Sequence, residues 1–202
     1  MEKLAERFIL FLSKNNENLD PNSKDFKKMK YVVWVFLDEL TKFLPYGLFF
    51  ALIGKLPEYL FAIAVLCPLR IIAGGYHTKT YWGCFFLTFS TFFAVIYLGI
   101  YFPLDITIKA SIFIVGLISI FFMAPVDNPN MPILREELKK GRRKIAVILF
   151  SVIGTMAVII NHHFANIAIW LLIVQILSLP AGIIMNKIHS RKTASIVSVT
   201  TS

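Results

Sequence analysis

Long apolar stretches alternate with short polar or basic stretches along the whole chain. The apolar stretches cover residues 31–53, 57–73, 81–102, 106–124, 145–160 and 164–185. A helix needs about 20 predominantly apolar residues to cross a bilayer. The pattern therefore predicts about six transmembrane or re-entrant helices. Pro68 interrupts the second stretch, which could break or re-enter rather than span cleanly, and four spans with two re-entrant segments fit nearly as well.

Local signals mark both ends of the helix predicted over 106–124. Asp105 is positioned to cap the helix over 106–124, and Pro125 is positioned to stop it.

Ahead of the first stretch, residues 2–14 place apolar side chains at helical spacing between charged ones. We expect an amphipathic helix there. It would lie in the membrane interface or pack on the protein's own cytoplasmic face.

Three charged residues interrupt the first apolar stretch. Lys42 follows Asp38 by four positions and Glu39 by three. Residues at this spacing are neighbours on a helix surface, so these charges can pair along one face. Charged side chains within membrane segments usually face a bundle interior or a wet cavity.

The composition is that of a membrane protein. The 202 residues are 57% hydrophobic and 16% charged, and the mean hydropathy is +0.70. Soluble domains are about 45–50% apolar and about 25% charged. The sequence predicts an all-α integral membrane protein with an interfacial N-terminal segment (1–30), a polytopic membrane domain (31–188) and a cytoplasmic tail (189–202).

The net charge of +9 is compatible with nucleic-acid binding or with a membrane protein whose basic residues gather in cytoplasmic loops. In a six-span topology, all 21 Lys and Arg except Lys42, Lys55 and Lys109 fall on one side. The positive-inside rule assigns that side to the cytoplasm. We therefore expect a bilayer and no nucleic acid as partner, with both termini in the cytoplasm.

The stretch from Arg70 to Cys84 carries the candidate chemistry, at the inner boundary between the second and third apolar stretches. A thiol attacks a peptide carbonyl well only as a thiolate, which needs a base or a positive neighbourhood. His77 is the candidate base, because imidazole titrates near neutral pH. Cys84 would lie in the first turn of the next helix, where the positive end of the helix dipole favours a thiolate.

The spacing of these two residues constrains the local fold. On a continuous helix, the seven positions from His77 to Cys84 would separate them by about 10.5 Å along the axis. A nucleophile and its base must approach to about 3 Å. We therefore expect the chain not to be one regular helix between them. Gly74, Gly75 and Gly83 give the backbone the freedom to fold back.

Other interpretations remain open on these residues alone. A cysteine in an apolar segment is usually a packing residue, as we interpret Cys67, and a histidine beside lysine is usually interfacial. Zinc takes four ligands, and no further Cys or His lies near His77 and Cys84, so we expect no metal or cofactor. A small transporter or exporter subunit is the alternative from another class, because such proteins also contain Pro-broken segments and buried charges.

The sequence leaves open which residue supports His77. Asp38 and Glu39 could reach a similar depth, and Asp127 lies on an inner loop. For the first two, an ordinary ion pair within their own helix is the stronger interpretation. Arg70 could hold a carboxylate, stabilise an oxyanion or extend to lipid headgroups.

This stretch resembles the AgrB family, the accessory gene regulator protein B of bacterial peptide quorum sensing. The resemblance rests on Arg70, on Gly74-Gly75-Tyr76-His77 and on Cys84 at the family's spacing. Ala124-Pro125 with Pro132 ahead of a basic run agrees with the family as well, and so does the amphipathic N-terminal segment. The resemblance covers essentially the whole chain.

The resemblance implies a cysteine endopeptidase of the cell membrane. Such an enzyme cuts the C-terminal tail from an AgrD-like precursor and promotes its closure to a thiolactone or lactone. It implies that His77 and Cys84 are catalytic and that the protein self-associates, which suggests a homodimer. Arg70 and Gly75 of the same motif are possible supporting residues.

Family precursors tend to carry an acidic tail, and a basic run of this chain could recruit it. The alternative is an ordinary anchor to anionic lipid. The run consists of Arg135, Lys139, Lys140, Arg142, Arg143 and Lys144.

Overall fold

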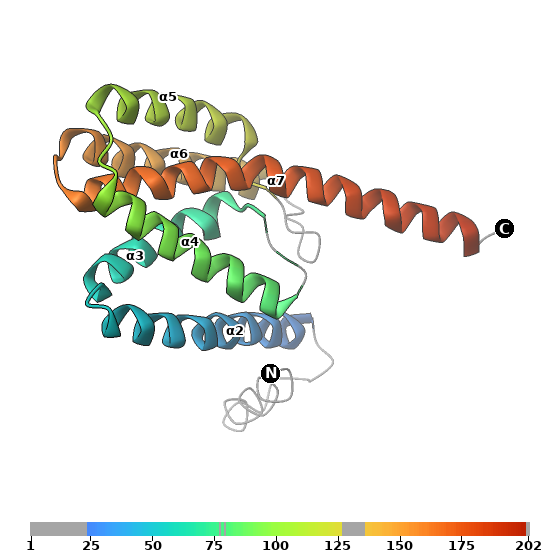
Figure 1. Ribbon diagram of the computed structural model, residues 1–202. Helices are drawn as coiled ribbons and strands as arrows, with labels where there is room; N and C mark the ends of the chain where they lie inside the picture. Colours follow the sequence, from blue (N-terminus) through green and yellow to red (C-terminus); the bar gives the residue numbers. More distant parts are fainter. Residues whose placement is uncertain (1–23, 77, 79, 127–135, 201–202) are drawn as a thin grey trace. The chain divides into compact units, whose positions relative to one another are not determined.

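The structure, a computed structural model, describes residues 24–76, 78, 80–126 and 136–200. The chain divides into two compact units, Met1–Leu56 and Pro57–Ser202. Helix α2 lies in the first unit, and α3 to α7, from Pro57 onward, lie in the second. The helices are α2 (Lys24–Leu52), α3 (Leu56–Ala73), α4 (Tyr81–Tyr101), α5 (Ile106–Met123), α6 (Glu136–Ile159) and α7 (His163–Thr200) (Figure 1).

Among the described helices, four are long and apolar enough to cross a membrane. They are α3, α4, α5 and the part of α7 over 163–188. The predicted all-α membrane class is confirmed, with fewer candidate spans than the six apolar stretches suggested. Helices α2 and α6 begin at Lys24 and Glu136, well before the apolar stretches within them. The apolar stretch of α2 also contains Asp38, Glu39 and Lys42, and α6 has only the residues from Ile145 to Ile159 after its basic segment.

Pro68 does not divide the second apolar stretch. Helix α3 continues through it to Ala73, so the break that the sequence allowed is absent from this helix. A proline removes one hydrogen bond from a helix, but membrane helices tolerate this because neighbouring groups satisfy the released carbonyl. Helix α7 likewise continues through Pro180.

Both ends of α5 were predicted correctly. Asp105 is its N-cap, and the Asp105 side chain accepts a hydrogen bond from the Thr107 backbone N–H at 3.1 Å. This bond lowers the pKa of the Asp105 carboxyl below its usual value. The helix ends at Met123, just before Ala124-Pro125.

Helix α7 packs against α4, α5 and α6 in the second unit (Figure 1). Glycines allow the helices to approach closely. A Cβ atom on Gly99 of α4 would lie 2.8 Å from Cα of Ile167 in α7, and one on Gly116 of α5 would collide with the Phe150 ring of α6. Small residues are common at helix interfaces in membranes, where association depends on close packing.

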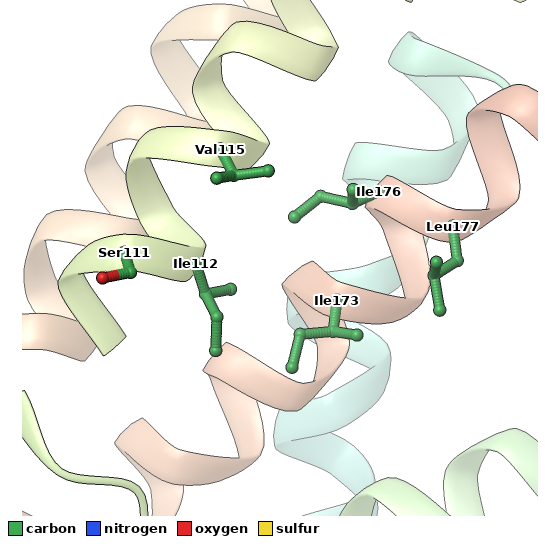
Figure 2. A pocket seen from close by; sticks show the side chains of 6 residues that line it. All are labelled: Ser111, Ile112, Val115, Ile173, Ile176 and Leu177. Carbon is green, nitrogen blue, oxygen red and sulfur yellow. The ribbon is translucent and has the colours of Figure 1, made fainter. Parts of the chain in front are cut away.

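An open hollow of about 280 Å³ lies between α5 and α7 (Figure 2). Its lining is aliphatic apart from Ser111, and the Ser111 hydroxyl donates to the carbonyl of Thr107 at 2.8 Å. Because the lining contains no titratable group, the hollow offers no catalytic chemistry. The candidate site must be sought elsewhere in the unit.

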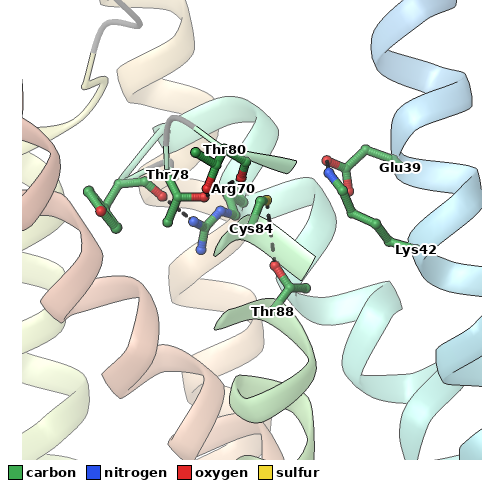
Figure 3. Close-up of polar contacts among 8 residues, drawn as sticks. Glu39, Lys42, Arg70, Thr78, Thr80, Cys84 and Thr88 are labelled. Atoms are coloured by element: carbon green, nitrogen blue, oxygen red, sulfur yellow. Dashed lines mark hydrogen bonds and ion pairs between the residues drawn. The ribbon is translucent and has the colours of Figure 1, made fainter. Parts of the chain in front are cut away.

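In the first unit, Glu39 and Lys42 form the predicted ion pair. The Lys42 Nζ lies 3.1 Å from the Glu39 Oε1, and the Lys42 side chain is 2% exposed (Figure 3). The Glu39 carboxylate is thus engaged by a neighbour on its own helix. The side chain of Asp38 and the expected interfacial helix over 2–14 lie outside the described part of the chain.

Candidate functional site

The connection between α3 and α4 carries the candidate site. Helix α3 ends at Ala73, α4 begins at Tyr81, and the described residues between them are not helical. For these residues, the prediction that the chain is not one regular helix from His77 to Cys84 is confirmed. His77 itself lies outside the described residues.

Cys84 lies in the first turn of α4, as predicted. Thr80 is the N-cap of this helix: its side chain accepts from the Gly83 N–H at 3.2 Å, and its carbonyl accepts from the Cys84 N–H at 3.0 Å. The Cys84 thiol is half-buried, and its Sγ lies 3.9 Å from the Thr88 Oγ1 one turn further along (Figure 3). The cap therefore fixes where the thiol leaves the helix.

Helix α7 holds the backbone that leads to His77. The side chain of Gln175 donates from Nε2 to the Gly74 carbonyl at 2.9 Å. The Tyr76 N–H donates to the Ser178 carbonyl at 3.0 Å. Two consecutive turns of α7 thus bind two residues of the loop.

Arg70 holds the same loop from the end of α3. Its guanidinium donates to the carbonyl of Tyr76 (Figure 3), and this carbonyl belongs to the peptide bond that leads into His77. The sequence suggested a carboxylate, an oxyanion or lipid headgroups as partners of Arg70. The structure adds a backbone carbonyl of the candidate site itself.

The residues that follow α5 also hold the start of the loop in place. The Val126 N–H donates to the Ala73 carbonyl at 2.9 Å. Arg143 of α6 in turn donates from Nε to the Ala124 carbonyl at 2.8 Å. One member of the basic run therefore stabilises the connection on which the loop rests.

The glycines before His77 are required by conformation and by space. Gly74 and Gly75 have φ angles of 72° and 149°, which favour glycine. A Cβ atom on Gly74 would overlap the Val126 carbonyl oxygen, and one on Gly75 would lie 2.6 Å from the Ser178 Oγ. Gly83 differs, because it lies within the first turn of α4.

The remaining predicted residues are only partly described. Asp127 and Arg135 lie outside the described residues. Lys140, Arg142 and Lys144 are exposed on the first turns of α6, and Lys139 is half-buried there.

Three residues of the site are not among those that the sequence pattern singles out. Thr80 could have been found as a helix cap, because it precedes an apolar run. Gln175 is fully buried, and a polar residue deep in an apolar span is itself a signal. Ser178 acts through its backbone carbonyl, which leaves no trace in the sequence.

Comparison with known proteins identifies the family. The family model Accessory gene regulator B matches residues 5–179, which include the α3–α4 loop, Cys84, Gln175 and Ser178. The chain belongs to the AgrB family. Membership places it in the agr quorum-sensing system and agrees with the resemblance carried by the motif between Arg70 and Cys84.

Individual AgrB relatives match over much of the chain. It is 28% identical over 185 residues to an AgrB-like protein of Clostridium beijerinckii, which covers 91% of this chain and 92% of the relative. It is 25% identical over 181 residues to AgrB-like protein 1 of Clostridium perfringens, with coverage of 89% and 95%. Accessory gene regulator protein B of Staphylococcus aureus is 26% identical over 111 residues, with coverage of 55% and 59%. No solved structure matches this chain.

Proposed function

We propose that this AgrB-family protein is a cysteine endopeptidase of the bacterial cell membrane. It cuts the C-terminal tail from an AgrD-like precursor and promotes cyclisation of the remaining peptide. The main support is the placement of Cys84 in the first turn of a capped helix, after a loop whose backbone is bound by α3 and α7.

The proposed reaction begins when His77 takes the proton of the Cys84 thiol. The thiolate attacks the carbonyl before the precursor tail, and the tail leaves as an amine that receives the proton from His77. An acyl-enzyme thioester remains. A Cys or Ser side chain of the precursor then attacks this thioester, which closes the ring and regenerates the thiol.

The helix start suits this reaction electrostatically. The amide dipoles at the beginning of α4 place partial positive charge beside Cys84, where the attacking sulfur carries negative charge. Ring closure also requires that water be kept from the thioester, because hydrolysis would otherwise compete. The half-buried position of the thiol meets that need better than an exposed one.

The partners follow from the same proposal. The protein lies in the lipid bilayer and acts as a homodimer on an AgrD-like precursor. The distribution of Lys and Arg assigns the catalytic loop and both termini to the cytoplasmic side. An amphipathic precursor would concentrate at that membrane surface.

Thiol reagents test the nucleophile and its side of the membrane in a Cys67→Ser variant, where Cys84 is the remaining cysteine. Cells that produce this variant and an AgrD-like precursor should lose cleavage after treatment with a permeant maleimide, because the thioester can no longer form. An impermeant maleimide added to intact cells should leave cleavage unchanged. Cleavage by fully labelled protein would contradict the role of Cys84, and inhibition by the impermeant reagent would contradict the orientation.

The basic run is proposed to recruit the acidic precursor tail. A charge reversal at Arg143 would also break its bond to Ala124, so Lys139 and Lys140 are altered instead. We expect Lys139→Glu with Lys140→Glu to raise KM for an acidic-tailed precursor, because like charges then repel. Added lysines in the precursor tail should partly restore KM. Equal kinetic losses for acidic and neutral tails would instead assign the run to lipid anchoring.

A further inference from the structure

One face of α7 fits against the loop that precedes His77. Gln175, Ser178 and Gly182 are spaced by three and four positions and so share a face of the helix. A Cβ atom on Gly182 would lie 2.9 Å from the carbonyl carbon and 3.1 Å from the carbonyl oxygen of Gly75. The loop backbone therefore rests directly on the backbone of α7 at this point.

The same helix also packs on the helix that carries Cys84. Helix α7 contacts α4, and the two backbones approach closely where Gly99 meets Ile167. The loop entering His77 is bound to α7 directly, and the helix bearing Cys84 is held to α7 at Gly99, 15 positions further along the same helix. We infer that α7 sets the distance between base and nucleophile, with Gln175 and Gly182 as positioning residues, an inference that rests on the proposed function.

The hydrogen bonding of Gln175 supports a positioning role. Its side chain is fully buried. Its Nε2 donates to Gly74, whereas its Oε1 has no hydrogen-bond partner among the described residues. A buried acceptor without a partner opposes stability. The bond from Nε2 is nevertheless the contact that ties Gly74 to α7, which is what a positioning role requires.

Because only one end of the Gln175 amide is hydrogen-bonded within the described part of the chain, replacing it should affect the rate of cleavage more than the stability of the fold. In Gln175→Met, an apolar side chain of similar length removes the bond to Gly74 and also removes the unpaired oxygen, so the two effects on stability oppose each other. The loop, however, loses one of its attachments to α7. Because a displacement of about 1 Å can reduce a rate by about 100-fold, catalysis should respond far more than folding.

The experiment compares Gln175→Met and Gly182→Ala with two matched controls, all in the Cys67→Ser protein. Gly141→Ala adds a methyl group on α6 where nothing lies within 4 Å. Asn166→Leu removes another buried amide of α7, whose Oδ1 also lacks a partner among the described residues, about 13 Å along the helix from Gln175. Thermal unfolding in detergent checks that each variant is folded.

Two readouts are measured across pH: cleavage of an AgrD-like precursor, and alkylation of Cys84 by iodoacetamide, which needs no precursor. We expect Gln175→Met and Gly182→Ala to lower kcat by about 10- to 100-fold with KM nearly unchanged. Their pH profiles of alkylation should shift toward that of His77→Ala. Both controls should stay within about twofold of the parent, because they leave the loop untouched.

The outcomes separate this inference from the proposed function. Folded Gln175→Met and Gly182→Ala proteins with the parent's kcat and alkylation profile would overturn the role of α7 while leaving Cys84 and His77 in place. A parent protein that does not cleave, and whose alkylation is indifferent to His77→Ala, would instead overturn the proposed function. If Gln175→Met fails to fold, Gly182→Ala alone decides the inference.

Discussion

Replacing Cys84 by alanine is expected to abolish cleavage of an AgrD-like precursor, and replacing His77 by alanine to reduce it by about 1000-fold or more. Without the thiol, no thioester can form, so neither cleavage nor ring closure can proceed. Without the imidazole, the thiol must lose its proton to water and the departing amine has no acid beside it. Single-turnover cleavage in proteoliposomes, with equal amounts of inserted protein, measures both effects.

The chain supplies its own control for this experiment. Cys67 lies within α3, six positions before the helix ends at Ala73, so Cys67→Ser should cleave at nearly the parent rate. A transporter or exporter subunit would be indifferent to both cysteines. Robust cleavage by the Cys84→Ala protein would remove the basis for a thiol mechanism.

The helical architecture was largely predictable from the sequence. Apolar stretches mark where lipid or the bundle covers a helix, and the predicted limits of α3, α4 and α5 agree with the structure to within a residue or so. The starts of α2 and α6 could not be found in this way. A helix continues into water wherever its backbone bonds are satisfied, and basic residues are compatible with helix, so Glu136 rather than Ile145 begins α6.

Within the site, local features were predictable and long-range ones were not. The place of Cys84 in the first turn of α4 follows from the apolar run that begins beside it. The bond between Gln175 and Gly74 joins residues 101 positions apart. No periodicity or spacing in the sequence encodes such a contact, because it depends on how α7 packs in the second unit.

Arg70 illustrates the same limit. From its position, Arg70 could hold a carboxylate, stabilise an oxyanion or extend to lipid headgroups. The structure shows it bound to the Tyr76 carbonyl, which becomes evident only once the chain turns at Gly74 and Gly75. The glycine pair was recognised as a point of backbone freedom, but its close fit against Val126 and Ser178 required the fold.

That close fit leads to a second large effect, which Gly74→Ala should produce. Gly74 has a φ of 72°, and the added methyl group would overlap the Val126 carbonyl oxygen. A backbone carbonyl cannot rotate away as a flexible side chain can, so the two backbone segments must move apart. We expect cleavage to fall by about 100-fold or more, because the shift displaces the peptide that carries His77.

Gly54→Ala is the matched control, because Gly54 has a φ of 69° but nothing lies within 4 Å of its added methyl group. Both substitutions therefore share a backbone strain of about 1–2 kcal/mol, and only Gly74→Ala adds the steric overlap. In detergent unfolding, the backbone strain should lower the stability of both proteins by similar amounts, and the overlap can lower that of Gly74→Ala further. Gly54→Ala should cleave within about threefold of the parent. Equal cleavage by the two variants would show that the fit of the loop against Val126 does not govern the position of His77. A selective loss in Gly74→Ala would identify contact with Val126, rather than glycine flexibility alone, as the reason for a glycine at this position.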